Sequence, residues 1–540
     1  MTLAVVVATE PYGEGATAGL GYAGETTVLD RLLDRLRALN VPEIRIITRP
    51  DLGQRLRKNG HEVVESDGLA GDLRVIGQLA REAHRPLLIL AGDLVASDEL
   101  LIRLESGGKS EAAAVTGPYS DAQTRPPIRT GKHLIDSAGS RYHQVTNPNA
   151  VFRGALKVGL EAAPALAEVA DELAGFVEAG PAEVEPVVRA GAVTEHIDII
   201  VDNNVDGSLG GKSRGPLPVL LATTAPAGDD APALLLVGLV RSGVRVTARD
   251  AGALVCERVL TPEQAAAARS AVEQVDEDRV RLDAAVKGDD GFFTTYAVST
   301  YSKYLARWAA KLHLTPNVVT SISMAVAVVA AVWFAAGTRG GMIFGAVLLY
   351  AAFVLDCVDG QLARYTRQFS TLGAWLDATF DRAKEYVVYA GLAVGSTAAA
   401  AGSTVHSGDV WPLAVGALAL QTVRHMVDFS FAASREALPP TPRPTRSLAE
   451  PGDGATVAAA RPAPTGAGMK VAAISNRTEK ITALRWAKKI VILPIGERFA
   501  LICLTAAIFN ARVTFLALLI WGSLAAAYTL TGRVLRSLAR

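Results

Sequence analysis

Four aspartates lie close together in an apolar part of the sequence: Asp356, Asp359, Asp377 and Asp381. The first two are three residues apart and the last two are four apart, so each pair lies on one face of a helix. A short turn joins the two predicted helices, which makes them antiparallel and lets the pairs face each other. Converging carboxylates repel one another unless cations lie between them, and Mg²⁺ or Mn²⁺ prefers oxygen ligands. The spacing therefore predicts a metal site.

These carboxylates are costly in an apolar segment. One carboxylate at the centre of a membrane helix costs about 2.5–3.5 kcal/mol on insertion scales, which argues that four of them have a function. Gly360 and Gly373 leave room where a substrate or a neighbouring helix approaches closely. The alternative is that the aspartates only form salt bridges with Arg364, Arg382 and Lys384 and so tie the two helices together.

The complete pattern, D-x2-D-G-x2-A-R-x8-G-x3-D-x3-D, begins at Asp356 and ends at Asp381. At every fixed position it resembles the signature of the CDP-alcohol phosphatidyltransferase family. The resemblance covers about residues 290–540 and includes a Thr-Pro-Asn sequence that begins at Thr315. It implies an enzyme of phospholipid biosynthesis that binds a CDP-alcohol, and it suggests a homodimer.

The resemblance also implies roles for individual residues. Asp356, Asp359 and Asp377 are expected as ligands of a two-metal centre of Mg²⁺ or Mn²⁺, with Asp381 as a further candidate ligand and as the general base. The residues expected at the CDP moiety are Gly360, Ala363, Arg364 and Gly373. An acceptor alcohol would attack the β-phosphate of CDP-diacylglycerol or a related CDP-alcohol, and CMP would be released.

The acceptor is suggested by cations in otherwise apolar runs. Arg382, Lys384, Arg424 and His425 are candidates, because a polyol phosphate such as inositol phosphate needs two or three cationic partners. The alternative is that Arg424 and His425 only cap or pair at a helix end.

Apolar runs after residue 300 predict six membrane helices in a domain of residues 315–540. The runs are 318–337, 340–355, 387–402, 410–431, 499–510 and 513–530, and the fifth is long enough only with residues 495 and 496. Lys and Arg gather in one set of loops, whereas the opposite loops carry only Arg339 and Arg512. The positive-inside rule then predicts a multi-pass protein of the cell membrane, with both termini and the active site in the cytosol.

Two segments, one before this domain and one within it, have distinct compositions. Residues 290–314 mix aromatic side chains with lysine and arginine, which predicts an amphipathic helix in the lipid headgroup layer. The alternative is an ordinary amphipathic helix on a domain surface. Residues 436–470 are rich in Pro, Ala, Gly and Thr and are predicted to be a disordered cytosolic loop.

Residues 1–285 predict a cytosolic α/β domain with a mostly parallel sheet. The expected strands are 3–9, 43–48, 86–93, 112–119, 218–223 and 233–240, and residues 27–39 have the periodicity of an amphipathic helix. The order of elements resembles a sugar-nucleotide or CTP nucleotidyltransferase, with Asp93 and Asp250 as candidate metal ligands.

The glycine-rich stretch of this domain departs from that pattern. Residues 1–30 hold no Lys or Arg, and Glu10, Glu14 and Glu25 would repel phosphate oxygens. A degenerate, non-catalytic domain is therefore expected, with a domain that makes the CDP-alcohol from CTP as the alternative. Residues 206–215 resemble a phosphate loop but have Asp206 where glycine is required, so a linker is expected there.

Overall composition excludes some functions. Lys and Arg together number 54, as do Asp and Glu, and this balance argues against a nucleic-acid-binding protein. The remaining alternative to an enzyme is a membrane scaffold or transporter derived from a transferase, and the intact aspartate set argues against it.

Overall fold

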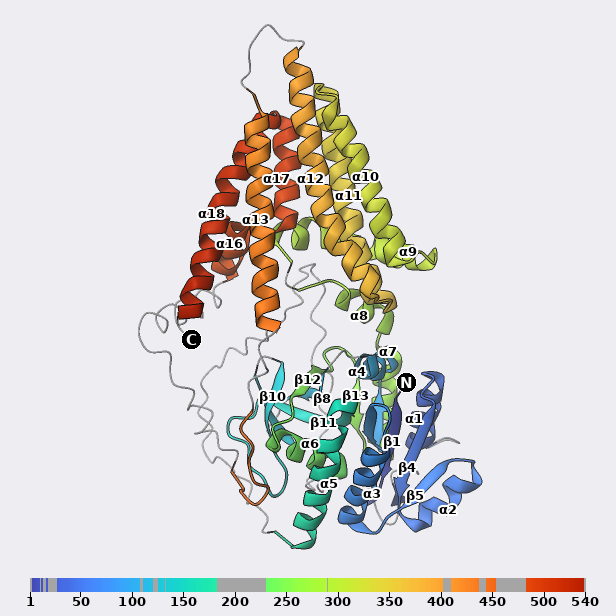
Figure 1. Ribbon diagram of the computed structural model, residues 1–540. Coiled ribbons are helices and arrows are strands. Elements are labelled where there is room, and N and C mark those ends of the chain that lie inside the picture. Colours follow the sequence, from blue (N-terminus) through green and yellow to red (C-terminus); the bar gives the residue numbers. More distant parts are fainter. Residues whose placement is uncertain are drawn as a thin grey trace, which may run out of the picture. The chain divides into compact units, whose positions relative to one another are not determined.

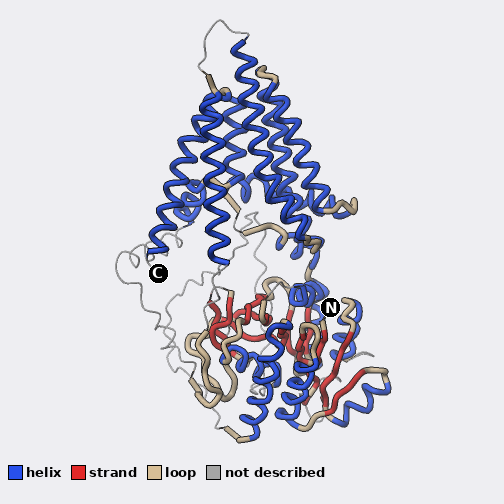
Figure 2. Tube along the Cα trace, in the orientation of Figure 1, coloured by secondary structure: helices blue, strands red, loops and turns tan. Residues whose placement is uncertain are grey.

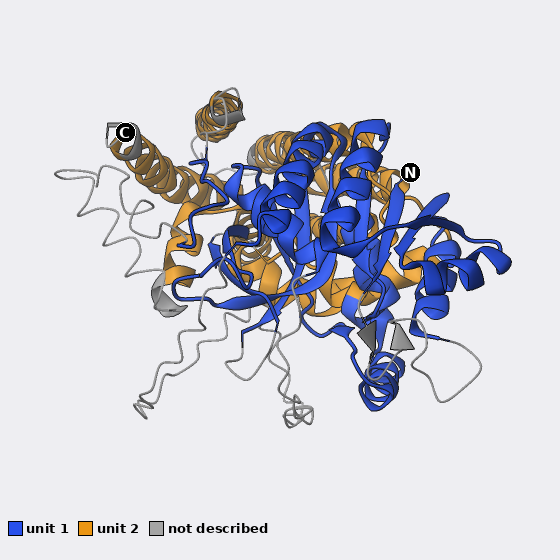
Figure 3. Ribbon diagram, turned by 90° about the horizontal axis from the view of Figure 1, so that it is seen from below, with its two compact units in different colours: residues 1–197, 211–280, 440–460 blue, residues 198–210, 281–439, 461–540 orange. Residues whose placement is uncertain are grey.

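The computed structural model (Figure 1) describes residues 2–9, 11–12, 16–17, 27–106, 110–119, 125–131, 133–181, 230–288, 290–401, 409–436, 443–452 and 482–538. The chain forms two compact units, which Figure 3 shows in different colours. Unit 1 comprises residues 1–197, 211–280 and 440–460, and unit 2 comprises residues 198–210, 281–439 and 461–540. Each unit is described separately below.

Unit 1 is built on a nine-stranded sheet (Figure 2). Its strands, in spatial order, are β5 (Glu62–Glu65), β4 (Glu43–Thr48), β1 (Leu3–Ala8), β6 (Leu87–Ala91), β11 (Ala150–Val158), β8 (Ala112–Pro118), β12 (Val246–Asp250), β10 (Leu134–Ala138) and β9 (Pro127–Gly131). Strands β5, β4, β1 and β6 are parallel, whereas β11 runs antiparallel to both of its neighbours, β6 and β8. The sheet is therefore mixed, not mostly parallel as the sequence predicts.

Helices cover both faces of this sheet. They are α1 (Val28–Ala38), α2 (Pro50–Lys58), α3 (Gly68–Glu82), α4 (Asp98–Ser106), α5 (Ala163–Glu178) and α6 (Ala231–Arg241). Helix α7 (Pro262–Gln274) packs instead against Val95, in a separate two-stranded sheet. Alternate residues of β1 point to opposite faces, so Val5 packs with α3, α5 and α6 while Val6 packs with α1, α2 and α4. The α/β architecture predicted for this region is confirmed.

Smaller elements complete unit 1. The short strands β7 (Leu94–Ala96) and β13 (Cys256–Arg258) pair with each other, as do β2 (Pro11–Tyr12) and β3 (Ala16–Thr17). A single 3₁₀ turn, η1 (Leu160–Ala162), precedes α5. Helix α8 (Glu277–Ala284) spans the boundary between the two units along the chain.

One predicted strand of unit 1 is wrong. Residues 233–240 belong to α6, whose first turn is capped by the Asp230 side chain and carries Pro232. Every residue of α6 is buried, and residues 231–240 are apolar on all sides of the helix. The hydrophobic periodicity of this segment therefore cannot distinguish a helix from a strand. The predicted strand 218–223, the segment 206–215 and the three glutamates of the glycine-rich stretch lie outside the described residues.

Unit 2 is helical. Its elements are η2 (Thr294–Val298), α9 (Ser299–Lys311), α10 (Pro316–Ala335), α11 (Arg339–Thr366), α12 (Thr371–Ala401), α13 (Trp411–Glu436), α16 (Thr482–Ile492), α17 (Ile495–Ile508) and α18 (Ala511–Leu538). A helix thus occupies each of the six apolar runs. By length and composition, α10, α11 and α18 can cross a membrane, and α16 with α17, bent by 68°, would make a fourth span among the described residues.

Helices α10 and α12 approach each other closely because α12 carries two glycines at their contact. A Cβ atom added at Gly395 would lie 1.9 Å from the carbonyl oxygen of Phe334, and one at Gly391 would lie 2.4 Å from that of Ala331. Both obstacles are backbone atoms of α10, which cannot rotate away. This contact fixes the position of α12, the helix that carries Asp377 and Asp381.

We expect Gly395→Ala to destabilise unit 2, because the new methyl group forces α10 and α12 apart. Overpacking of this kind costs about 1–3 kcal/mol. The midpoint of thermal unfolding of the full chain in detergent measures the effect. Gly340→Ala is the matched control, since an added Cβ at Gly340 of α11 meets no atom within 4 Å. Equal midpoints for the two variants would show that the glycine contact does not hold the helices together.

Candidate active site

The aspartates lie on α11 and α12, on either side of a tight turn. Helix α11 ends at Arg367, whose φ of 59° is left-handed and stops the helix. Helix α12 starts at Thr371, and the Ser370 hydroxyl accepts a hydrogen bond of 2.9 Å from the Gly373 amide in its first turn. The chain therefore reverses within a few residues, as the sequence predicts. Side chains from the second half of α11 and the first half of α12 then face each other, while both helices pack against α10.

Three carboxylates converge across this pair of helices. Asp356, Asp359 and Asp377 each offer an oxygen atom, and these atoms all lie within 4.8 Å of one another. Asp359 is 3% exposed, and its Oδ2 atom has no hydrogen-bond partner. A buried carboxylate oxygen without a partner is costly unless a cation binds it. The donor set, oxygen only and anionic, fits a hard divalent cation.

Asp381 lies beside this group and not within it. The ammonium group of Lys384 contacts Asp356 Oδ1 and lies 3.8 Å from Asp381 Oδ1. Lys384 is 1% exposed, so its charge is held among the carboxylates. Lys384 thus lies next to the candidate metal ligands and neutralises part of their charge.

The residues expected at the CDP moiety fall into two places. The Arg364 Nε atom donates to the carbonyl oxygen of Ala285, and a Cβ atom added at Gly360 would lie 3.4 Å from the guanidinium nitrogens of Arg364. Ala363 lies on the same helix, half-buried. A Cβ atom added at Gly373, by contrast, would lie 2.7 Å from Asn317 Oδ1. Gly373 therefore allows α12 to pack closely against the start of α10.

Asn317 belongs to the Thr-Pro-Asn sequence at the start of α10. Thr315 caps that helix, because its hydroxyl accepts a hydrogen bond from the Val318 amide, and Pro316 occupies the first turn. The motif thus begins a helix and presents Asn317 to the turn before α12.

The candidate acceptor residues separate in the same way. Arg382 donates to the carbonyl oxygen of Ala378 and stacks 4.5 Å above the Phe429 ring. Arg424 Nη2 donates to the carbonyl oxygen of Ile492 at 2.8 Å. Its neighbour His425, also on α13, belongs to a different cluster. That cluster lies one turn along α12 from Asp381.

This second cluster is centred on Glu385. The Glu385 side chain is fully buried, and its Oε1 accepts a hydrogen bond of 2.5 Å from Arg498 Nε while its Oε2 lies 3.3 Å from His425 Nε2. Arg498 also donates to the carbonyl oxygen of Leu493 at 2.9 Å. Helices α12, α13 and α17 thus meet at a buried ionic group that adjoins Lys384.

Sequence reasoning missed Glu385 and Arg498. The only signal for Arg498 is that Glu497 and Arg498 interrupt an apolar run, and Glu385 follows the motif without belonging to it. Intramembrane ionisable residues generally face the interior of a bundle and pair with one another. That rule predicts that Glu385 and Arg498 each have a charged partner, but it does not identify the partner.

In unit 1, Asp93 does not meet Asp250. Asp93 is 1% exposed, and its Oδ1 accepts a hydrogen bond of 2.7 Å from Arg258 Nε, which in turn contacts Asp230. Asp250 ends β12 and is exposed. The aspartates of α11 and α12 form the one candidate metal group among the described residues.

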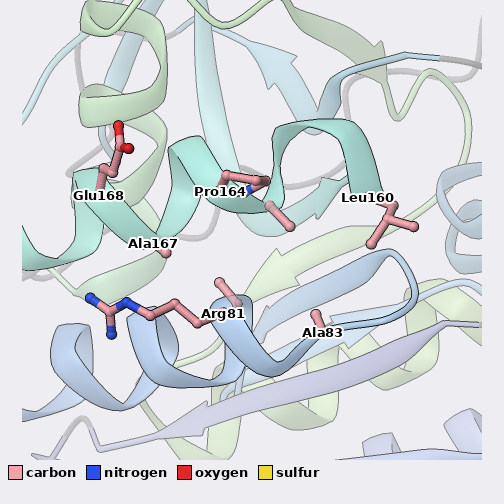
Figure 4. A pocket seen from close by; sticks show the side chains of 8 residues that line it. Arg81, Ala83, Leu160, Pro164, Ala167 and Glu168 are labelled. Atoms are coloured by element: carbon pink, nitrogen blue, oxygen red, sulfur yellow. The ribbon is translucent and has the colours of Figure 1, made fainter.

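Unit 1 also has a surface depression, between α3 and α5 (Figure 4). Small apolar side chains line it, and the charged residues there are Arg81 and Glu168. None of the candidate site residues contributes to this depression.

Among solved structures, nucleotidyltransferases show weak similarity to part of this chain. The inositol-1-phosphate CTP transferase from T. maritima is similar over 51% of this chain and 97% of its own, at 12% identity and a TM-score of 0.34. A putative glucose-1-phosphate thymidylyltransferase from Bacillus anthracis gives a TM-score of 0.32. Such low scores do not define a fold, and the description of unit 1 rests on its own sheet.

Sequence comparison finds relatives of known class. A bifunctional IPC transferase and DIPP synthase of Rubrobacter xylanophilus is 34% identical over 111 residues, 21% of this chain and 24% of the relative. An archaetidylinositol phosphate synthase of Pyrococcus horikoshii is 34% identical over 17% of this chain and 47% of its own. A phosphatidylinositol phosphate synthase of Mycolicibacterium smegmatis is 35% identical over 18% and 44%.

The matches span less than half the length of each of these curated relatives. A sequence model of the family described as CDP-alcohol phosphatidyltransferase matches residues 313–521, which include all four motif aspartates. This part of the chain is therefore similar to the CDP-alcohol phosphatidyltransferases, which confirms the resemblance carried by the aspartate motif.

Proposed function

We propose that this protein is a membrane transferase of phospholipid biosynthesis. It moves a phosphatidyl group, or another substituted phosphoryl group, from a CDP-alcohol such as CDP-diacylglycerol to a polyol phosphate, and it releases CMP. The observation that carries the proposal is the convergence of Asp356, Asp359 and Asp377 from two helices, within a sequence that matches the family.

The donor would bind at the carboxylate group. Asp356, Asp359 and Asp377 would hold two divalent cations, Mg²⁺ or Mn²⁺, with Asp381 as a further ligand. When bound, such ions neutralise the pyrophosphate and stabilise charge on the attacked phosphorus and on the leaving group. Gly360 keeps the face of α11 open beside Arg364, whose guanidinium is available to phosphate oxygens or to the cytidine.

Asp381 would act as the general base. It lies beside the three carboxylates but outside their group, and its Oδ1 atom has no hydrogen-bond partner in the described structure. It would accept the proton of the acceptor hydroxyl while the hydroxyl oxygen forms a bond to the β-phosphorus and the bond from phosphorus to the CMP oxygen breaks. Lys384, in contact with Asp356 and near Asp381, would keep both side chains in place.

The acceptor would be recognised through its phosphate. Arg424 lies near the buried group of Glu385 and Arg498. Its Nη2 atom donates to the Ile492 carbonyl at 2.8 Å and its Nη1 atom donates to Gln421 Oε1 at 3.4 Å, so a phosphate would take the place of the longer bond. A guanidinium can bind a phosphate with two parallel hydrogen bonds, which suits a polyol phosphate better than an uncharged polyol. His425, Arg382 and Lys384 would shape this side of the site.

The test is CMP release from CDP-diacylglycerol in membranes that contain the full chain, with inositol phosphate, inositol or glycerol phosphate as acceptor. We expect Mg²⁺-dependent or Mn²⁺-dependent release that a polyol phosphate stimulates more than tenfold over its unphosphorylated form. Arg424→Ala should raise the KM for the acceptor and leave that for the donor unchanged. Arg339→Ala is the matched control, since Arg339 also donates to a backbone carbonyl, that of Phe509. Release with no acceptor and no metal dependence would contradict the proposal.

Unit 1 would not catalyse nucleotidyl transfer. The Oδ1 atom of Asp93, the candidate metal ligand, is bound by the buried guanidinium of Arg258, which neutralises this carboxylate and competes with a metal for it, although its Oδ2 atom has no hydrogen-bond partner. The alternative, a unit that makes the CDP-alcohol, predicts CTP-dependent pyrophosphate release. The full chain, incubated with CTP and a polyol phosphate, should release none, and release that Asp93→Asn removes would overturn this view.

The helices on the six apolar runs, α10, α11, α12, α13, α17 and α18, would cross the membrane, with both termini and the active site in the cytosol. Helix α9 would lie in the headgroup layer, since Tyr304 and Trp308 are 56% and 60% exposed. The family suggests a homodimer. Size-exclusion chromatography with light scattering of the purified protein tests this state.

A further inference from the structure

Residues 443–452, hereafter the docking segment, belong to the connection between α13 and α16 of unit 2 but lie within unit 1. They fall inside the stretch for which composition predicts disorder. Figure 1 shows this orange segment beside β10 and α6. Its sequence, RPTRSLAEPG, offers one large apolar side chain, Leu448, and Leu448 packs against the core formed by α3, α5 and α6.

Arg241, the last residue of α6, holds the backbone of the segment. Its guanidinium donates to the carbonyl oxygens of Ser447, Glu450 and Gly452 at 2.7, 2.8 and 2.9 Å. The Arg241 carbonyl oxygen accepts a hydrogen bond of 2.8 Å from the Arg446 amide. Arg241 is 5% exposed, and a buried guanidinium is costly unless such acceptors surround it.

His143 holds the segment from a second side. Its Nε2 donates to the carbonyl oxygen of Leu448 at 2.9 Å, which leaves Nδ1 to accept from the Ser140 hydroxyl at 2.8 Å. The ring also stacks on Phe176 of α5, with centroids 5.6 Å apart. The adjacent Gln144 amide donates to the Pro451 carbonyl at 2.8 Å.

Arg443 attaches the start of the segment. It donates to the carbonyl oxygen of Ile135 at 2.8 Å and pairs with Asp136 at 3.1 Å, both on β10. A Cβ atom added at Gly243, whose φ is 87°, would lie 3.3 Å from the Arg443 carbonyl oxygen. The surface of unit 1 is thus shaped for a close backbone approach at this point.

We infer that the docking segment is a built-in anchor: through it, the connection between α13 and α16 binds a preformed site of unit 1 made by His143, Arg241 and β10. Among the described residues, the chain then joins unit 1 to the helical unit after residue 280 and holds the two together again through the docking segment. The connection between α13 and α16 must also lie on the same side of the bilayer as unit 1. The inference is independent of the proposed activity.

The anchor carries its own dependence on pH. Burial and the nearby charge of Arg241 lower the pKa of His143 to about 4, despite the hydrogen bond to Leu448. Released from the segment, His143 would regain a pKa near its usual value of about 6.5. The released state binds a proton more readily than the docked state. The docked state therefore has its full stability above about pH 6.5 and loses stability as the pH falls toward 4. The charged group that faces the ring is Arg241, and its other neighbours are Ser140, Phe176 and Leu448.

Hydrogen–deuterium exchange of the full chain in detergent tests the anchor. At pH 7 we expect peptides that cover residues 443–452 to exchange at least tenfold more slowly than an unstructured peptide, since the Arg446 amide is hydrogen-bonded. Arg241→Ala should abolish this protection. Lowering the pH to 5 should reduce the protection factor in wild type by on the order of tenfold, which follows from the shift of the His143 pKa.

Two further variants keep the test decisive. Arg443→Ala changes the segment and leaves the sequence of residues 1–285 intact, so it should speed exchange in 443–452 without affecting α5 or α6. Arg74→Ala removes an exposed ion pair with Glu178 elsewhere in unit 1 and should change nothing in the segment. Exchange at the rate of an unstructured peptide in wild type, or protection unaltered in both Arg241→Ala and Arg443→Ala, would overturn the inference.

Discussion

Replacing Asp381 by asparagine should lower acceptor-stimulated CMP release at least 100-fold, while the protein remains folded. Asparagine keeps the size of the side chain but cannot accept a proton, and a positioned general base contributes about 10²–10⁴-fold to rate. The loss should appear mainly in kcat, because Asp356, Asp359 and Asp377 remain to hold the cations and the donor. Initial rates of CMP release at saturating CDP-diacylglycerol and polyol phosphate measure it.

The control for Asp381→Asn is Asp428→Asn in the same unit. Asp428 is 57% exposed and pairs with Arg533 of α18, so its loss should leave kcat unchanged. Equal thermal unfolding midpoints for wild type and both variants would exclude a folding defect. Turnover of Asp381→Asn within threefold of wild type would show that another group takes the proton.

Replacing Glu385 by glutamine should destabilise unit 2 by about 3–5 kcal/mol, the usual cost of removing one partner from a buried ion pair. The variant leaves Arg498 buried with its charge uncompensated, because the partners that remain are neutral carbonyl oxygens, those of the glutamine amide and of Leu493. His425 loses its carboxylate neighbour as well. A lower midpoint of thermal or denaturant unfolding, compared with wild type in the same detergent, measures the effect.

A double substitution separates the cost of the unpaired charge from the cost of lost packing. Glu385→Leu with Arg498→Met replaces both charges by apolar groups, and it should recover much of the stability that Glu385→Gln loses. The recovered protein should still bind polyol phosphate poorly, because the cationic side of the site has changed. Full stability of Glu385→Gln alone would mean that water or another residue compensates Arg498.

The sequence predicts the carboxylate group of α11 and α12 better than it predicts the surroundings of that group. Asp356, Asp359 and Asp377 come together as their spacing indicates, because a helical turn and a short connection suffice to fix them. Glu385 and Arg498 are more than 100 positions apart, and their pairing depends on how α12 and α17 pack. Local periodicity contains no information about that packing.

Two other features show where pattern reading fails. Helix α6 is buried all round, so its apolar run is equally consistent with a strand. Residues 443–452 have the composition of a disordered loop, yet their backbone carbonyls and one leucine are bound by unit 1. Recognition of a backbone by Arg241 and His143 leaves almost no trace in the segment's own composition.

The docking segment also has a consequence for biosynthesis. Arg241 is translated about 200 residues before Arg443. At about 5–20 residues per second, the surface around His143 and Arg241 is complete but uncovered for about 10–40 s while helices α10 to α13 are made. Unit 1 therefore finishes folding in two stages, and the second must wait for synthesis of the intervening helices. Ribosome-bound chains that stop before residue 443 should be more sensitive to protease around His143 than chains that extend past residue 452.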